Sequence, residues 1–169
     1  MKVECNLEDV FEVTKRKLEE GGLLLTTVGR DRRYNVMTIG WGLVGRLWRE
    51  QVFMVAVRPS RYTFTFIEET DTFTVNVPAE GMEKVTAYCG EVSGRDHDKL
   101  TELELAVSEG RRVTAPIIDR CIAHFECEVI GKSKLIPELL SPIVQKRHFS
   151  SEDYHTLYFG RLLSILKDR

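Results

Sequence analysis

The sequence lacks several features that would direct it to a membrane or to nucleic acid. No apolar run approaches the roughly 20 residues of a membrane span, and the N-terminus lacks the apolar stretch of a signal peptide. There is no basic surplus either, because 24 Lys and Arg stand against 26 Asp and Glu, for a formal charge of -2. Nucleic-acid binding draws on such a surplus. We therefore expect a soluble, cytoplasmic protein whose partners are neither membranes nor nucleic acids.

Cysteine is scarce. Cys5, Cys89, Cys121 and Cys127 form no C-x-x-C pair and match no zinc-site spacing. Cys121 and Cys127 fall in one strand-like run, which would hold them about 20 Å apart, too far for a disulfide. We expect reduced thiols that pack as small apolar residues, as in a reducing compartment.

Common catalytic motifs are also missing. The chain has no G-x-S-x-G elbow, P-loop or G-x-G-x-x-G fingerprint, so serine-hydrolase, nucleotide-hydrolase and Rossmann chemistry have no support. His97, His148 and His155 have no carboxylate or cysteine at ligand spacing, and we expect no metal site. His124 lies in an alternating strand pattern, where a single histidine is usually structural.

The pattern that is present predicts one domain, residues 1–169, made mainly of strands. A helix from Leu7 to Glu20 is expected first. The predicted strands are 23–28, 35–41, 51–57, 73–77, 123–130 and 155–166, with helices near 61–70, capped by Ser60, and 81–89. Such irregularly inserted helices favour an antiparallel barrel over a βαβ fold. Gly42 and Gly45 suggest a bend or bulge after the second strand, and residues 132–151 suggest a long surface loop.

The segment Arg58–Thr63 joins a strand end to a helix start. Free backbone amides and the positive end of the helix dipole make such a junction an anion site. Ser60 and Thr63 add hydroxyls, and Arg58 and Arg61 add charged donors suited to a phosphate. The alternative is that Ser60 only caps the helix and the arginines are solvated.

Two further segments carry candidate ligand contacts. The strand Asn35–Trp41 holds polar and aromatic side chains beside glycines, which would let a flat ligand approach the backbone. Alternatively, Trp41 lies in the core and Asn35 in a turn. The loop Ser93–Lys99 is either a solvated turn or a second set of ligand contacts, with Asp98 capping a helix toward Leu103.

Five motifs occur along the chain in this order: N-x-M-T-I-G-W, R-P-S-R-Y-T, F-I-E-E, F-T-V-N-V-P and C-G-E-V-S-G-R-D-H-D-K. With these motifs the sequence resembles the flavin reductase-like family, which includes flavoredoxins and FMN-binding split-barrel proteins. The resemblance runs from about Leu23 to Leu100, with a looser match in the last strands. It implies a six-stranded antiparallel Greek-key split barrel, mainly β with inserted helices, that forms a homodimer and holds FMN near the subunit interface. Residues 7–20 and 132–151 fall outside the matching motifs.

Carried over residue by residue, the resemblance assigns three groups of FMN contacts. Along the isoalloxazine and ribityl chain lie Asn35, Met37, Thr38 and Trp41; at the phosphate lie Arg58, Ser60, Arg61, Tyr62 and Thr63; and Ser93, Gly94 and Lys99 close the site. Asn76 would support this set from behind. An ammonium group of Lys99 beside the ring would favour its anionic reduced form.

The implied activity is an NAD(P)H-dependent flavin reductase that passes hydride through bound FMN to a second flavin, ferric iron or another acceptor. No protein side chain then needs to be catalytic, because the chemistry belongs to the cofactor. The alternative is a flavoredoxin-type carrier that holds FMN permanently and exchanges electrons with a redox partner protein. A third possibility is a barrel that has lost its flavin and serves as a binding module.

Overall fold

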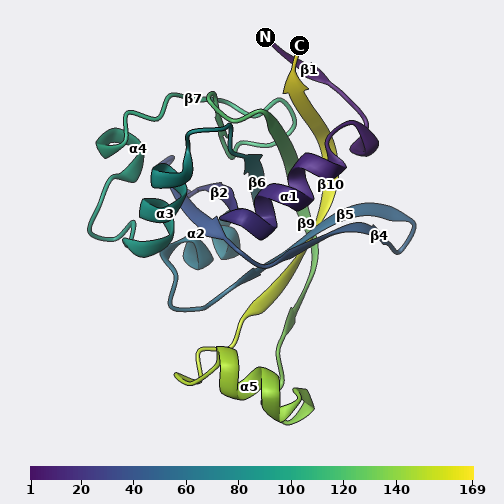
Figure 1. Cartoon of the computed structure of the whole chain (residues 1–169), viewed down its shortest axis with the longest axis vertical. Helices are drawn as coiled ribbons and strands as arrows, with labels where there is room; N and C mark the ends of the chain where they lie inside the picture. The colour runs from purple at the N-terminus through teal and green to yellow at the C-terminus, as the bar shows by residue number, and fades with distance from the viewer.

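The computed structural model describes residues 1–169. Its elements, in chain order, are β1 (Lys2–Glu4), η1 (Leu7–Asp9), α1 (Phe11–Glu20), β2 (Leu23–Val28), β3 (Tyr34–Ile39), β4 (Gly42–Leu47), β5 (Glu50–Val57), α2 (Tyr62–Thr70), β6 (Thr72–Val77), α3 (Glu83–Glu91), α4 (Lys99–Glu102), β7 (Val107–Ser108), β8 (Ile117–Ile118), β9 (Ala123–Lys134), η2 (Pro137–Leu139), α5 (Pro142–His148) and β10 (Thr156–Asp168) (Figure 1). No helix among them is long and apolar enough to span a membrane.

One antiparallel sheet forms the body of the molecule. Its strands follow the order β3-β2-β6-β9-β10-β5-β4, and β1 pairs with β10. The two ends of that order, β3 and β4, are joined by Gly40 and Trp41 alone, so the sheet must curve back on itself. The Ala56 amide donates to the Trp41 carbonyl across 3.4 Å at the point of closure. The predicted class, mainly β with a split barrel, is confirmed.

The sheet has more strands than the six expected. The prediction of a bend or bulge at Gly42 and Gly45 is wrong, because both residues lie within β4, which pairs with β5 from Gly42↔Val55 to Leu47↔Glu50. The tight turn between these strands places Trp48 and Arg49 at positive φ. Gly42 and Gly45 interrupt the alternation of apolar and polar side chains by which β4 could have been recognised as a strand.

Buried apolar side chains from β2, β3, β5, β6, β9 and β10 fill the interior of the barrel. Phe53 of β5 meets Phe125 of β9 edge to face, with ring centroids 5.1 Å apart. Phe73 of β6 packs so close to β10 that a Cβ at Gly160 would lie 2.4 Å from its ring. Fully burying one such side chain contributes about 1.5–3 kcal/mol, so these rings supply much of the barrel's stability.

A buried polar network lies behind β3. The Asn76 side chain on β6 donates to the Leu24 carbonyl at 3.1 Å and accepts from His124 Nδ1 at 2.7 Å and from the Ile118 amide at 3.1 Å. Burial lowers the pKa of His124 to about 3, so its ring stays neutral, consistent with a structural histidine. Because Leu24 pairs with Thr38, Asn76 holds in place the strand on which β3 rests.

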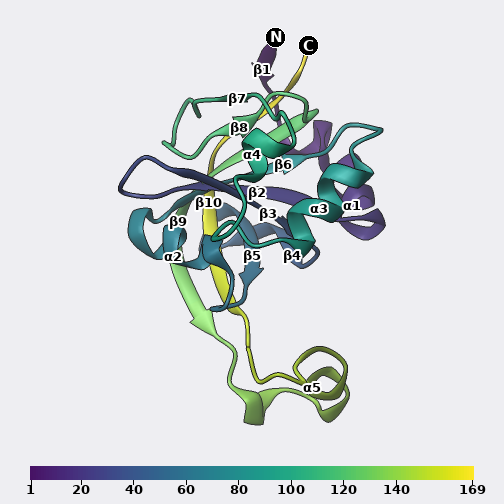
Figure 2. The same ribbon diagram turned by 90° about the vertical axis from the view of Figure 1, so that its left-hand side faces the viewer.

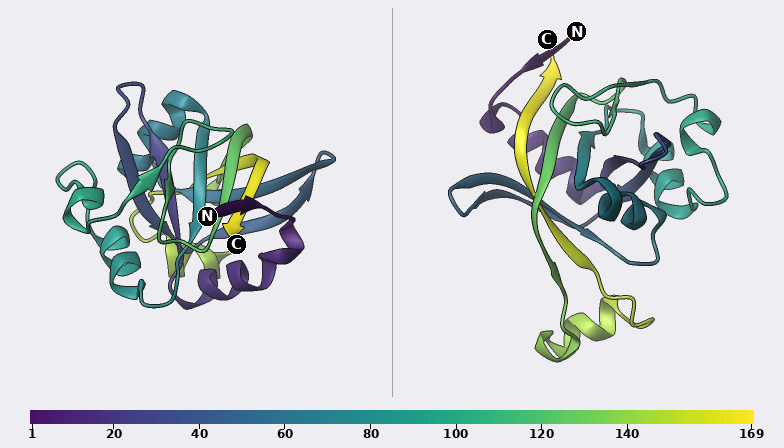
Figure 3. Two further views of the ribbon diagram at one scale, coloured as in Figure 1. Left: turned by 90° about the horizontal axis from the view of Figure 1, so that it is seen from above. Right: turned by 180° about the vertical axis from the view of Figure 1, so that it is seen from behind.

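The segment 132–151 is not the loop that its prolines suggested. β9 and β10 extend beyond the barrel as a two-stranded arm, and η2 and α5 fold at its tip (Figures 1 and 2). Pro137 and Pro142 stand at the first positions of these helices, where the missing amide hydrogen costs nothing. Seen from behind, the two termini lie together at the end of the molecule opposite α5 (Figure 3).

Candidate functional site

Two adjoining cavities lie where the end of β3 meets the start of α2. The wider one, about 460 Å³, is bounded by β3, β5 and the segment of the arm between α5 and β10. The smaller, about 100 Å³, lies between β3, α2 and the loop after α3, and shares Met37, Ser60 and Arg61 with the first. Every predicted site residue lines one or both: Asn35, Met37, Thr38, Trp41, Arg58, Ser60, Arg61, Tyr62, Thr63, Ser93, Gly94 and Lys99.

The first turn of α2 presents free backbone donors. The helix begins at Tyr62, with Arg61 as its extended N-cap residue. The amides of Tyr62 and Thr63 donate to no acceptor in the protein, whereas the Phe64 amide returns to the Arg61 carbonyl at 3.0 Å. These two unpaired amides and the helix dipole give the junction the donors that an anion site requires.

Asn35, Thr63 and Gly94 are packed together in the smaller cavity. Asn35 Nδ2 donates to Thr63 Oγ1 at 2.6 Å, so the alternative that Asn35 belongs to a turn is wrong: it lies buried within β3. A Cβ at Gly94 would lie 2.0 Å from Asn35 Oδ1 and 3.1 Å from the Tyr62 ring. Only glycine fits at this position.

Two cationic side chains meet the C-terminal end of α3. Arg61 donates to the Gly90 carbonyl at 3.3 Å, and Lys99 Nζ donates to the Cys89 and Val92 carbonyls at 3.2 Å each. Lys99 is buried, and its desolvation lowers the pKa of the ammonium group. It lines the smaller cavity and not the wider one with Trp41, which associates it with the phosphate end of the expected ligand.

The wider cavity is lined by the partly exposed ring of Trp41 and by the more buried Met37 and Thr38. Trp41 is 54% exposed, so the alternative that it lies in the core is wrong; its ring meets His148 edge to face at 5.2 Å. Met37 is nearly buried, and Thr38 Oγ1 donates to the Thr86 carbonyl at 2.5 Å. Thr38 is therefore tied to α3 through its hydroxyl.

Ser60 and Arg58 contact the end of α5 and the segment that follows it. The helix-capping prediction for Ser60 is wrong, because it lies one residue before the N-cap and its hydroxyl donates to the Asp153 carboxylate. Arg58 donates to the His148 carbonyl at 2.6 Å and to the Asp153 carbonyl at 3.2 Å. The alternative that the arginines are solvated is therefore wrong for Arg58. Its guanidinium ties the arm to the end of β5, at the wall of the wider cavity.

The loop after α3 is ordered by its own polar side chains. Ser93 Oγ accepts from the Arg95 amide at 3.2 Å, and Arg95 donates to the Ser60 carbonyl at 2.8 Å. Asp98 caps α4 by accepting from the Thr101 amide, as predicted. Both interpretations hold in part: residues 94–96 form a turn and residues 95–98 are exposed, while Ser93, Gly94 and Lys99 line the smaller cavity.

Sequence reasoning missed two residues of the wider cavity, Asp153 and His155. His155 is buried, forms no side-chain hydrogen bond, and has its pKa lowered to about 4 by desolvation and then by Arg58. Because the next residue, Thr156, pairs with Val57, His155 lies beside the end of β5. No local motif marks this position, because the two strands are far apart in the sequence.

The donor set suits one elongated ligand with an anionic end. Two free amides, Arg61 and the hydroxyl of Thr63 surround the junction of the cavities, while the wider cavity offers Trp41 and Met37 for a flat ring. The residues present therefore fit a phosphate-bearing flavin. No group of three or more His, Cys, Asp or Glu side chains is arranged to hold a metal ion, and all four cysteines are free.

The chain is similar to several known proteins in sequence and in fold. An uncharacterized protein of Archaeoglobus fulgidus is 36% identical to this chain over 131 residues. The match covers 78% of this chain and 64% of the length of that relative. Flavoredoxin of Desulfovibrio vulgaris (Miyazaki F) superposes with a TM-score of 0.70 at 24% identity, over 87% of this chain and 69% of that one. Flavoredoxin from Methanosarcina acetivorans gives 0.68 at 28% identity, over 87% and 68%.

The family model described as "Flavin reductase like domain" matches residues 15–168, nearly the whole chain. This match extends the resemblance carried by the motifs of residues 23–100 through the arm to the last strand. The chain belongs to the flavin reductase-like domain family.

Proposed function

We propose that this protein binds FMN across the two adjoining cavities and acts as an NAD(P)H-dependent reductase of a second flavin, ferric iron or another acceptor. The observation that carries the proposal is the free first turn of α2, where the Tyr62 and Thr63 amides have no acceptor in the protein and Arg61, Tyr62 and Thr63 line the smaller cavity. Bound FMN would supply the hydride and single-electron chemistry.

The protein's own residues bind and orient the cofactor. The Tyr62 and Thr63 amides, with Arg61, would hold the phosphate through charge-assisted hydrogen bonds. Met37 and Trp41 would pack on the ring system. His155 keeps a neutral imidazole in the wider cavity at pH 7, available as a hydrogen-bond donor or acceptor to the ring or to a second substrate.

Electron carriage is a second candidate function. Its support is the similarity to the flavoredoxin of Methanosarcina acetivorans, at 28% identity over 87% of this chain. A carrier of this kind would hold FMN permanently and exchange electrons with a partner protein, without oxidising NAD(P)H at a useful rate.

Anaerobic stopped-flow mixing separates the two functions. The FMN-loaded protein is mixed with NADH or NADPH, and the flavin absorbance is followed. Bleaching within seconds supports the reductase. No bleaching with either nucleotide, from a protein whose flavin is still reduced by dithionite, refutes the reductase and leaves the carrier.

A homodimer is part of the proposal. Its support is a set of exposed apolar side chains: Trp41 at the wider cavity, Leu43 on the adjoining strand β4, and Ile136, Leu139 and Ile143 on the arm. A second subunit that covers these residues would close the ring end of the site. Sedimentation velocity tests this, and a monomer at micromolar concentration would refute it. The free cysteines suit the cytoplasmic location that the sequence suggests.

A further inference from the structure

A short segment at the end of α5, residues 148–153, is held against the wall of the wider cavity, and we call it the strap. Arg58 donates to the carbonyl of His148 at 2.6 Å and to that of Asp153 at 3.2 Å. The hydroxyl of Ser60 donates to the Asp153 carboxylate. Arg58 and Ser60 are two of the residues expected at the flavin phosphate, so the strap engages donors that the ligand would use.

Asp153 places a negative charge beside the donors of the anion site. Ser60 lines both flavin cavities, and Asp153 lines the wider one. A hydroxyl has a single hydrogen, so while Ser60 donates to Asp153 it cannot donate to a phosphate. The free amides of Tyr62 and Thr63 follow Ser60 closely, at the start of α2. A phosphate bound at these amides would have the Asp153 carboxylate as a neighbour of the same charge, and like charges repel one another.

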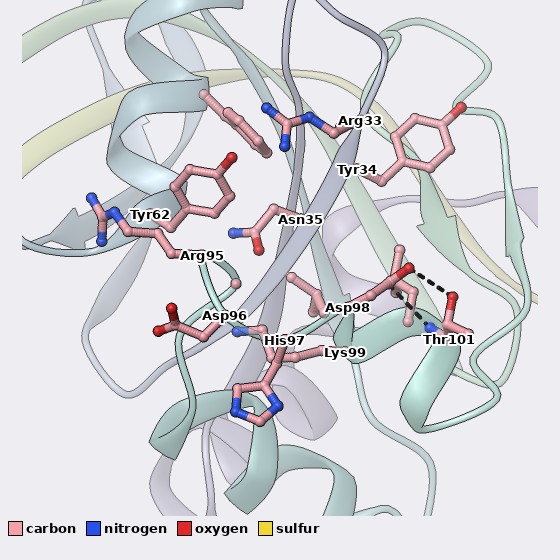
Figure 4. A pocket seen from close by; sticks show the side chains of 14 residues that line it. Arg33, Tyr34, Asn35, Tyr62, Arg95, Asp96, His97, Asp98, Lys99 and Thr101 are labelled. Atoms are coloured by element: carbon pink, nitrogen blue, oxygen red, sulfur yellow. Dashed lines mark hydrogen bonds between the residues drawn. The ribbon is translucent and has the colours of Figure 1, made fainter.

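The backbone of Ser60 is fixed from the other side. Arg95 donates to the Ser60 carbonyl at 2.8 Å, and its guanidinium carbon lies 5.2 Å from the centre of the Tyr62 ring (Figure 4). The Arg61 amide also donates to the Arg58 carbonyl at 3.0 Å. The hydroxyl of Ser60 can therefore change its partner by rotation about the Cα–Cβ bond, without any movement of α2.

The strap packs around one ring and not in the barrel core. Phe149 is buried and stacks on Tyr154 with ring centroids 4.8 Å apart, and the Arg58 guanidinium carbon lies 5.5 Å from the centre of the Phe149 ring. The clusters of buried apolar side chains in the body of the molecule contain no residue of the strap. The strap can therefore move away from Ser60 while the barrel stays intact.

We propose that Asp153 is an internal anion that competes with the flavin phosphate for Ser60, and that FMN binding releases the strap. The Ser60 hydroxyl then donates to the phosphate in place of the carboxylate. This inference rests on the proposed function, because it requires the phosphate to bind at the first turn of α2. It makes Asp153 a residue that lowers the affinity for FMN and leaves the affinity for riboflavin, which has no phosphate, unchanged.

Fluorescence titration of the parent protein and of Asp153→Asn with FMN and riboflavin tests the competition. Asparagine keeps the size of the side chain and a neutral acceptor for Ser60, but it removes the charge. Asp153→Asn should bind FMN about fivefold or more tightly than the parent protein does, and riboflavin with the parent affinity. Glu152→Gln makes the same change of charge at the neighbouring, exposed residue, and this matched control should leave both affinities unchanged.

An unchanged or weaker FMN affinity in Asp153→Asn overturns the proposal, and so does an equal gain in Glu152→Gln. Failure of the flavin function gives a different result, because the parent protein and both variants would then bind neither flavin. If FMN binds to the parent protein and Asp153→Asn shows no gain, only the present inference fails.

Trp41 can report the release of the strap. Its ring meets His148 edge to face at 5.2 Å, and in Trp48→Phe it is the only tryptophan of the chain. Titration of Trp48→Phe with inorganic phosphate, which does not absorb the emission, should shift the Trp41 fluorescence to longer wavelength as His148 moves away. Addition of Asp153→Asn should lower the phosphate concentration required. Sodium chloride at equal ionic strength is the control, and no shift up to tens of millimolar phosphate overturns the proposal, even where FMN still binds.

Discussion

Asn35 Nδ2 donates to Thr63 Oγ1 across 2.6 Å, joining the start of β3 to the first turn of α2. β3 carries the residues expected to face a flavin ring, and α2 carries the amides expected to hold its phosphate. The hydrogen bond therefore fixes the two halves of the candidate site to one another before any ligand arrives. Such preorganisation lowers the ordering cost of binding.

Arg61 is expected to act on the phosphate alone. Arg61→Gln should weaken FMN by about tenfold or more, the cost of one charge-assisted hydrogen bond, and should weaken riboflavin by less than twofold. Fluorescence titration with both flavins measures the ratio. Arg49→Gln serves as the control, and an equal loss for both flavins would move the phosphate away from Arg61.

Gly94 should tolerate no side chain. In Gly94→Ala the new methyl group meets Asn35 Oδ1, and either the loop or Asn35 must move. We expect a loss of about 1–3 kcal/mol in the free energy of unfolding, together with weaker FMN binding. Gly45→Ala is the matched control, because a Cβ there meets nothing within 4 Å. A stable Gly94→Ala protein with full FMN affinity would show that this packing does not matter.

The buried histidines should make the fold sensitive to acid. The pKa of His124 is lowered from 6.5 to about 3 and that of His155 to about 4, so between pH 6.5 and those values the unfolded chain binds more protons. Unfolding free energy should therefore fall as pH falls through this window, by up to about 1.4 kcal/mol per pH unit for each histidine.

His124→Asn isolates the larger contribution. Its unfolding free energy, measured in urea from pH 7 to pH 4, should depend less steeply on pH than that of the parent protein, whatever its value at pH 7. Parallel pH profiles would mean that His124 is protonated in the folded state.

Arg58 should hold the arm against the barrel. Its guanidinium donates to two arm carbonyls, and Lys146 and Arg147 in α5 offer trypsin sites close by. Arg58→Gln should be cut at these sites about tenfold faster than the Arg49→Gln control, since one charged hydrogen bond contributes about 1.5 kcal/mol or more. Equal cleavage rates, located by mass spectrometry, would show that Arg58 does not restrain the arm.

Local patterns predicted the strands and the three site segments because each lies within one stretch of chain. β2, β5 and β6 are short apolar runs closed by turns, and the ligand-facing residues accompany them in fixed order. β4 was missed because Gly42 and Gly45 interrupt its pattern, and the arm because Pro137 and Pro142 suggest a loop.

The remaining features depend on long-range pairing. Asp153 and His155 reach the cavity only because β10 pairs with β5 in one register, and nothing in their own segment marks them. Ser60 likewise does not cap α2 as expected, because its hydroxyl donates to the carboxylate of Asp153, which is distant in the sequence.

Gel filtration of the protein after incubation with excess FMN tests the flavin site most directly. We predict that one FMN per chain co-elutes with the protein and that riboflavin under the same conditions is largely lost, because the phosphate contacts at α2 are missing. Elution of all FMN in the free-ligand fraction, from a folded protein, would contradict the proposed site.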